Sequence, residues 1–136
     1  MIVPDSSILI AALASYHDAH ERTVNILDGD SRLIVHVAFE ASSVLSRMPE
    51  GQRMEAAIVV DALERDFPEP WLALDHDEQR ACLRRAVDAG VSGGALYDAL
   101  IAGTAAKHGA ALISADRRAQ STYEAMGVAT KFVDPG

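Results

Sequence analysis

Short apolar runs and longer stretches with helical spacing alternate along this chain. The short runs predict strands at 1–5, 32–37, 71–74, 110–113 and 128–133. Apolar residues at helical spacing predict helices over 6–13, 17–27, 38–48, 52–66, 75–89, 95–108 and 117–126. Strands that alternate with helices pair in parallel through crossovers, so the pattern predicts an α/β fold with helices on both faces of the sheet.

Local residues mark the ends of several of these helices. Ser6 or Ser7 can cap the first helix, because a hydroxyl there accepts a bond from an otherwise unpaired backbone amide. Asp75 can cap the fifth helix in the same way. Gly109 suits the C-terminal cap of the sixth helix, where the backbone often turns left-handed.

Length and composition fit one ordinary domain. With 136 residues, 49% of them hydrophobic and 24% charged, the chain has enough apolar material for a single core over 1–136. Its one cysteine, Cys82, excludes an internal disulfide and fits a reducing, cytoplasmic compartment. The longest apolar runs reach about ten residues, half of what a membrane span needs, so we expect no membrane contact.

The charge balance limits how this chain could bind nucleic acid. Twelve basic residues against 20 acidic residues give a net charge of −8. Broad, sequence-independent attraction to nucleic acid relies on basic surface that displaces counterions, and that is not the composition here. A nucleic-acid function would therefore depend on a local basic patch or on bound metal.

Four acidic residues stand where the predicted fold gives them a chemical meaning. Asp5 and Asp116 each follow a predicted strand, and in parallel α/β sheets ligands bind outside the carboxyl ends of the strands. Glu40 and Asp98 lie near the starts of two helices in apolar surroundings. We therefore expect the four carboxylates to converge on one edge of the sheet.

The surroundings of these acids indicate a metal site. An ionised carboxylate on an apolar face costs several kcal/mol unless it is paired, and a helix N-terminus returns only about 0.3–1 kcal/mol. No Lys or Arg lies within three residues of Asp5, Glu40 or Asp98. Oxygen-only ligands favour Mg²⁺ or Mn²⁺ over zinc. Ions held this way can grip a phosphodiester and activate water for in-line attack.

Four segments also carry a family resemblance: Ile2–Ser7, Phe39–Ala41, Tyr97–Ala102 and Leu112–Arg118. Together they resemble the PIN-domain nucleases, and most closely the VapC-type toxins of bacterial toxin–antitoxin pairs. The likeness spans essentially the whole chain. It implies a three-layer α/β/α sandwich around a parallel sheet of about five strands, and cleavage of RNA with bound Mg²⁺ or Mn²⁺. Pro4 departs from the family pattern, and we expect a bulge there because proline lacks a ladder donor.

The resemblance also implies roles for single residues. Asp5 and Asp98 would be the principal metal ligands, Asp116 would complete the metal site, and Glu40 would position water or a second ion as the fourth catalytic acid. Two serine hydroxyls, those of Ser114 and Ser6, would orient a carboxylate or contact the substrate phosphate. Independently of the resemblance, two basic residues directly follow the last acid, Arg117 and Arg118. Their side chains could contact RNA phosphates through bidentate hydrogen bonds.

Partners follow from the same likeness. A VapB-type antitoxin would cover an apolar groove built from the helices between Ile8 and Leu63, and would insert a basic side chain near the acids. A second apolar face would form a homodimer. The expected substrate is structured RNA, such as tRNA or rRNA.

Two other readings of the acids lead to different functions. A haloacid-dehalogenase-like phosphatase would use Asp5 as nucleophile, but that chemistry needs a second Asp two residues later, where this chain has Ser7. A catalytically inert PIN-like module would only bind partners, and the presence of all four acids counts against it. For the nuclease, replacing Asp5 or Asp98 by Ala is expected to abolish cleavage with the fold intact.

Overall fold

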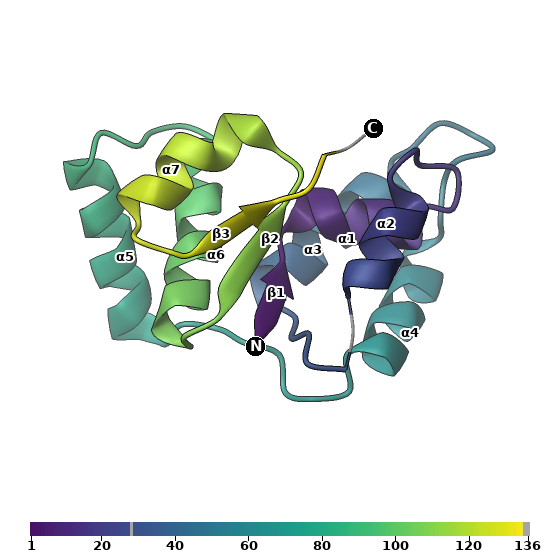
Figure 1. The fold of residues 1–136 in the computed structure, drawn as a ribbon, viewed down its shortest axis with the longest axis horizontal. Helices are drawn as coiled ribbons and strands as arrows, with labels where there is room; N and C mark the ends of the chain where they lie inside the picture. Colours follow the sequence, from purple (N-terminus) through teal and green to yellow (C-terminus); the bar gives the residue numbers. More distant parts are fainter. Residues whose placement is uncertain (28, 135–136) are drawn as a thin grey trace.

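The computed structural model describes residues 1–27 and 29–134, and its centre is a parallel sheet with helices on both faces (Figure 1). Three strands lie side by side in chain order: β1 (Ile2–Pro4), β2 (Ala111–Ser114) and β3 (Thr130–Phe132). All of their pairings are parallel, as the alternation of strands and helices predicts.

Two further extended segments continue the sheet beyond β1. Ser31 forms a parallel bridge to Ile2, and Ile34 forms a parallel bridge to Leu72. The sheet therefore runs Leu72, then 31–34, then β1, β2 and β3, which is the α/β/α sandwich that the sequence predicts. The strands predicted at 32–37 and 71–74 are reduced to these bridges, so three regular strands stand where about five were expected.

The predicted strand at 32–37 is wrong over its second half, where a helix has already begun. Helix α3 spans Val35–Ser46, and Ile34 is its N-cap. The buried residues Val37, Ala41 and Leu45 repeat every four positions, so the helical period starts before the predicted boundary at 38. Burial of this apolar face overrides the weak strand preference of the β-branched residues.

The remaining helices follow the predicted order, with shifted boundaries. Helix α2 begins three residues later than predicted, at His20, and α4 begins four residues later, at Ala56. Residues 117–119 form a 3₁₀ turn, η1, before the last helix. The helices are α1 (Ser6–Leu13), α2 (His20–Ile26), α4 (Ala56–Asp66), α5 (His76–Asp88), α6 (Ala95–Lys107) and α7 (Gln120–Ala125), with η1 at Arg117–Ala119. None of those in the described ranges is long and apolar enough to cross a membrane.

Two predicted helix ends are confirmed in detail. Asp75 accepts a hydrogen bond from the backbone amide of Glu78, and the Glu78 side chain accepts one from the amide of Asp75, which is a complete capping box. Gly109 follows α6 with a φ of 66°, in the left-handed region that favours glycine.

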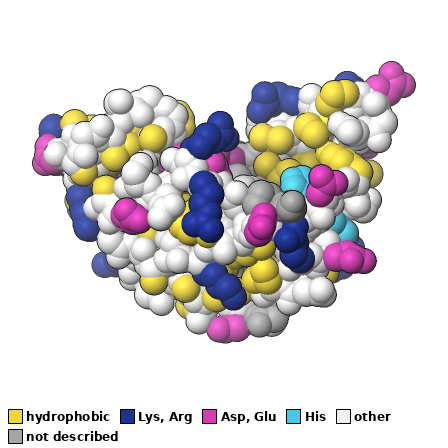
Figure 2. Space-filling model, turned by 45° about the horizontal axis from the view of Figure 1, so that its top comes forward, with side chains coloured by type: hydrophobic (Ala, Val, Ile, Leu, Met, Phe, Trp, Pro, Cys, Tyr) yellow, Lys and Arg dark blue, Asp and Glu magenta, His cyan; other side chains and the backbone are white. Residues whose placement is uncertain are grey.

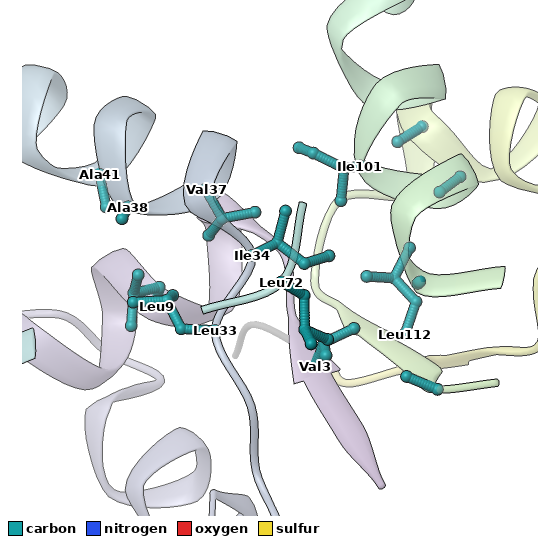
Figure 3. Close-up of a cluster of buried hydrophobic side chains, with 14 of the residues drawn as sticks. Val3, Leu9, Leu33, Ile34, Val37, Ala38, Ala41, Leu72, Ile101 and Leu112 are labelled. Atoms are coloured by element: carbon teal, nitrogen blue, oxygen red, sulfur yellow. The ribbon is translucent and has the colours of Figure 1, made fainter. Parts of the chain in front are cut away.

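The strands bury alternate residues on the two faces of the sheet. Val3 and Leu112 point into the larger core, where they meet side chains of α1, α3 and α6 such as Leu9, Val37 and Ile101 (Figure 3). The next residue of β2, Ile113, points to the other face. There it packs against Ile8 of α1 and Val133 at the end of β3. Helices therefore fix the sheet from both sides.

The bulge predicted at Pro4 is absent. Pro4 keeps regular register with Ile113 of β2, and the amide of Asp5 donates to the Ile113 carbonyl at 2.9 Å. In a parallel ladder successive residues bond to opposite neighbours, so the Pro4 nitrogen faces away from β2. On that side β1 has only the single bridge at Ile2, so the missing donor breaks no hydrogen bond in the described sheet.

Helices α5 and α6 approach closely at a glycine. A Cβ added to Gly103 would lie 2.6 Å from Sγ of Cys82, which is closer than packed atoms allow. Cys82 is buried, and its thiol donates to the Ala99 carbonyl at 3.5 Å. The single cysteine is therefore a packing residue between the two helices.

Candidate active site

The strand order reverses between β1 and β2. The segment that follows β1 in the chain, 31–34, lies on one side of it, and β2 lies on the other. Such a switch point opens a crevice at the carboxyl ends of the two strands. Figure 2, which brings the top of Figure 1 forward, shows a hollow at this edge with acidic side chains at its base and basic side chains beside it.

Asp5 lies at the end of β1 and begins α1. Its side chain accepts a hydrogen bond from the Ile8 amide at 3.2 Å, so Asp5 itself is the N-cap of α1. The cap predicted at Ser6 or Ser7 is wrong, because the strand ends one residue earlier and the helix follows at once. With 3% of its surface exposed, Asp5 is buried, and an ionised group there needs several donors.

A serine hydroxyl links Asp5 to the segment after β2. The hydroxyl of Ser7 donates to Oδ1 of Asp5 at 2.5 Å and accepts a bond from the Ala115 amide at 2.9 Å. The orienting contact therefore belongs to Ser7, whereas the sequence analysis selected Ser6. The Ser6 hydroxyl is buried and has no hydrogen-bond partner among the described residues.

Tyr123 of α7 is a third donor to Asp5, and it was not among the predicted site residues. Its hydroxyl donates to Oδ2 of Asp5 at 2.8 Å, and both side chains are buried. Burial, followed by the charge of Asp5, raises the pKa of Tyr123 above its usual value, so the phenol stays protonated and remains a donor. The contact spans 118 positions, and no local pattern marks it in the sequence.

The pKa of Asp98 is raised in part by the other three acids. Burial first, and then the charges of Glu40, Asp116 and Asp5, raise its pKa from 3.8 to about 6, while Arg118 lowers it. The structure thus brings the four predicted carboxylates into one electrostatic cluster from four separate parts of the chain. Asp98 lies in the first turn of α6 and Glu40 in α3, so two helices and two strand ends build the cluster.

Glu40 is held by its neighbours on α3 and α6. Nε2 of His36, one turn earlier, lies 3.0 Å from Oε1 of Glu40, within ion-pair distance. The two atoms are not aligned as a hydrogen bond, and neither has such a partner among the described residues. The His36 ring stacks on Tyr97, with 5° between the planes and 5.2 Å between the centroids. This stack joins the helix that carries Glu40 to the helix that carries Asp98.

Asp116 lies at the rim of the cluster and caps the 3₁₀ turn η1. Its Oδ1 accepts bonds from the amide of Arg118 at 3.0 Å and from Nε of the same residue at 3.2 Å. Arg118 is otherwise exposed, whereas the Arg117 guanidinium lies 4.5 Å from the centre of the Phe132 ring. Among the described residues, Arg118 therefore contacts an acid of the cluster and Arg117 does not.

Ser114 contacts the backbone of Asp116, the last acid of the cluster. It is fully buried, and its hydroxyl accepts a hydrogen bond from the Asp116 amide at 3.0 Å. A hydroxyl in that position orients the turn that carries Asp116. Because it is covered, it does not reach a substrate phosphate in this conformation.

The donor set of the cluster fits Mg²⁺ or Mn²⁺. All four acids offer oxygen, and their mutual repulsion at Asp98 is the excess negative charge that a divalent cation relieves. Oε1 of Glu40 is buried and accepts no hydrogen bond among the described residues, and only the His36 ring lies within ion-pair distance of it in that part of the chain. Within the described ranges no three metal-binding side chains lie close enough to share one ion. Mg²⁺ does not require this, because it takes one or two carboxylates and keeps several waters.

Known proteins of the same fold and similar length resemble this chain. Residues 2–125 match the PIN domain family. Ribonuclease VapC40 of Mycobacterium tuberculosis is 40% identical over 134 residues, which cover 98% of this chain and 99% of that protein.

Two solved structures share the fold. FitAcB from Neisseria gonorrhoeae superimposes with a TM-score of 0.70 at 21% identity, covering 99% of this chain and 98% of that one. VapBC2 from Rickettsia felis, bound to a DNA fragment from their promoter, gives a TM-score of 0.67 at 15% identity over 98% and 100% of the two chains. Family match, identity and fold agree, and the chain belongs to the PIN-domain family and, within it, to the VapC-type ribonuclease toxins.

Proposed function

We propose that this protein is a divalent-metal-dependent endoribonuclease that acts as the toxin of a toxin–antitoxin pair. The observation that carries the proposal is the convergence of four carboxylates at the switch point, where burial and the other three charges raise the pKa of Asp98 to about 6. A cluster of acids that repel one another costs stability, and a metal-dependent reaction is the function that needs it. The 40% identity to a ribonuclease supports the same conclusion.

Each acid has a distinct part in the proposed reaction. Asp5, Asp98 and Asp116 would hold Mg²⁺ or Mn²⁺, one or two of them directly and the rest through waters that the ion keeps. The ion would supply positive charge to the phosphodiester and lower the pKa of water. Glu40 orients the attacking water and accepts its proton, and its Oε1, which accepts no hydrogen bond from the described residues, has the capacity to do so. Exposed Arg118 contacts a substrate phosphate from the rim of the site.

The substrate we propose is structured RNA, such as tRNA or rRNA. The chain carries a net charge of −8, so long stretches of nucleic acid are not attracted to its whole surface. Binding then depends on the metal and on the local cations Arg117 and Arg118. A folded RNA that presents one exposed loop to a small site suits this arrangement better than an extended strand.

The direct test is cleavage by the purified protein. With Mg²⁺ or Mn²⁺ it is expected to cut total cellular RNA at a few defined positions, which sequencing of the new 5′ ends would map. EDTA should stop the reaction, and added Mn²⁺ should restore it. Equal cleavage in EDTA would refute the metal dependence, and no cleavage of any RNA with either metal would favour the inert module.

We also propose that a VapB-type antitoxin covers this protein and that two copies of it pair. Large apolar side chains stand exposed, among them Phe39 at 73%, Tyr97 at 58% and Leu83 at 55% of their surface. Such residues commonly mark protein contacts. The Rickettsia felis structure of similar fold is an assembly of VapBC2 with DNA, which supports a two-component system here.

Light scattering on the purified chain, alone and mixed with the product of the adjacent upstream gene, would test both pairings. We expect the mass of a dimer for the chain alone and a larger complex in the mixture. RNA cleavage should fall as the complex forms, because the antitoxin inserts a basic side chain near the acids. A mixture whose components scatter independently would argue against the antitoxin, and a monomeric mass at micromolar concentration against the homodimer.

A further inference from the structure

We infer that Tyr123 is a positioning residue of the nuclease site, which fixes the Asp5 carboxylate so that one oxygen faces the metal in a single orientation. This inference rests on the proposed metal-dependent function and adds a residue to it. Tyr123 touches neither substrate nor reacting atoms by this assignment. It acts through Asp5.

The hydrogen bond that carries the inference is well enclosed. The Tyr123 hydroxyl donates to Oδ2 of Asp5 at 2.8 Å, Tyr123 is 1% exposed, and Asp5 is 3% exposed. Water therefore has little access to either group, and the bond is stronger in this setting than at the surface. Tyr123 lies on α7, which packs against α6, the helix that carries Asp98. Helix α7 thus contacts Asp5 through Tyr123 and also packs against the helix that carries Asp98.

The other donors to Asp5 act on a different oxygen. Ser7 and the Ile8 amide both donate to Oδ1, and the bond from the Ile8 amide caps the N-terminus of α1. Within the described part of the chain, Tyr123 alone donates to Oδ2. Capping of α1 therefore does not require the phenol, and the Tyr123 bond needs another explanation.

The explanation lies in the number of hydrogen-bond acceptor positions on the Asp5 carboxylate. The two oxygens of an ionised carboxylate offer about four lone-pair positions. Three of them are occupied in Asp5, two on Oδ1 and one on Oδ2. The carboxylate is left with one uncommitted position, on Oδ2, and cannot turn without breaking a buried bond.

A fixed carboxylate with one free position favours Mg²⁺ over larger ions. Mg²⁺ requires near-ideal octahedral geometry, whereas Ca²⁺ accepts flexible sites and carboxylates that bind through one or both oxygens. Without the phenol, Oδ2 would have two free positions, and only the two bonds on Oδ1 would hold the carboxylate among the described residues. Mg²⁺ should then lose more affinity than Ca²⁺, because only Mg²⁺ depends on the fixed orientation.

The first experiment compares Tyr123→Phe with the wild-type protein and with Tyr16→Phe, which removes a hydroxyl from an exposed tyrosine. Calorimetric titration would give the affinities for Mg²⁺ and Ca²⁺. Removal of a group that orients a metal ligand commonly costs about 10–100-fold in affinity. We expect Tyr123→Phe to lose about tenfold for Mg²⁺ and less than about threefold for Ca²⁺, and kcat to fall while KM for RNA stays unchanged.

The control variant and two contrary results test the inference. Tyr16→Phe should match the wild-type protein in both titrations. If folded Tyr123→Phe binds Mg²⁺ as tightly as the wild-type protein, or loses Mg²⁺ and Ca²⁺ equally, the inference is overturned. Wild-type protein that binds Mg²⁺ but cuts no RNA would instead overturn the proposed function and leave the role of Tyr123 measurable.

A second measurement uses the unmodified side chains and does not depend on the folding of a variant. The chain has three tyrosines, so protein labelled with ¹³C at the ring carbon next to the hydroxyl gives three signals. Tyr16→Phe and Tyr97→Phe would assign them by the signals they remove. Mg²⁺ should shift the Tyr123 signal, because a cation on Oδ2 withdraws charge from the acceptor of its hydrogen bond. A Tyr123 signal that stays in place at saturating Mg²⁺ would overturn the inference.

Discussion

Replacing Asp98 by Asn is expected to abolish RNA cleavage and to make the metal-free protein more stable at pH 7. The two effects have one cause. Burial and three neighbouring carboxylates raise the pKa of Asp98 from 3.8 to about 6, so the ionised group opposes folding and attracts a cation. Asn has nearly the same shape but carries no charge, and therefore removes both the repulsion and the metal ligand.

The sign of the pH dependence follows from linkage. Between pH 3.8 and about 6 the folded state holds the Asp98 proton more tightly than the unfolded state does, so stability falls as the pH rises through that window. Two pKa units correspond to about 3 kcal/mol, an upper bound. Because Asp98 is only partly buried and solvent screens its neighbours, we expect a gain of about 1 kcal/mol for Asp98→Asn above pH 6.

Urea unfolding in EDTA at pH 4 and pH 7 would measure this gain. The difference between Asp98→Asn and the wild-type protein should be near zero at pH 4 and close to its full size at pH 7. Adding Mg²⁺ should stabilise the wild-type protein and leave the variant unchanged, because only a protein that binds the ion gains from it. Asp61→Asn, at an exposed position on α4, is the matched control. A variant that is less stable than the wild-type protein at pH 7 would contradict the repulsive cluster.

The acids at strand ends could be predicted from sequence because their positions depend on a general rule. Asp5 and Asp116 follow short apolar runs, and the carboxyl ends of parallel strands must meet at one edge. Asp98 could be predicted in a similar way, since an acid in the first turn of an apolar helix needs a partner. Each of these signals is local, and each survives the shift of a helix boundary by a few residues.

The supporting residues could not be predicted, because their contacts are set by tertiary packing. Tyr123 contacts Asp5 across 118 positions of the chain. Ser6 was predicted in place of Ser7, because a one-residue difference in where the strand ends decides which hydroxyl faces the carboxylate. The predicted strand at 32–37 failed for a related reason. A run of β-branched residues fits either a strand or a buried helix, and only the packing of α3 decides.

Asp5→Ala is expected to abolish cleavage and also to destabilise the fold, in contrast to the expectation from sequence that the fold stays intact. Asp5 caps α1, and loss of a cap costs about 1 kcal/mol. The Ala variant also leaves the buried Tyr123 hydroxyl without its acceptor, which costs about 1–3 kcal/mol. Together these losses amount to about 2–4 kcal/mol, enough to confuse a missing ligand with a damaged fold.

Asp5→Asn separates the two effects. The amide oxygen can still accept from Ser7 and the Ile8 amide, and the Tyr123 hydroxyl can turn to accept a bond from the amide nitrogen. Unfolding free energy should therefore change by less than about 1 kcal/mol, while cleavage falls by about 1,000-fold or more, since a metal contributes several kcal/mol to such a transition state.

Asp75→Ala is the matched control for the capping role. Asp75 caps α5 with the same side-chain geometry but takes no part in the carboxylate cluster, so its loss should cost about 1 kcal/mol and leave cleavage unchanged. Urea unfolding and single-turnover cleavage of the three variants would therefore rank Asp5→Ala lowest in stability and both Asp5 variants lowest in rate. Full activity in Asp5→Asn would remove Asp5 from the metal site, because the one property that this variant lacks is the negative charge.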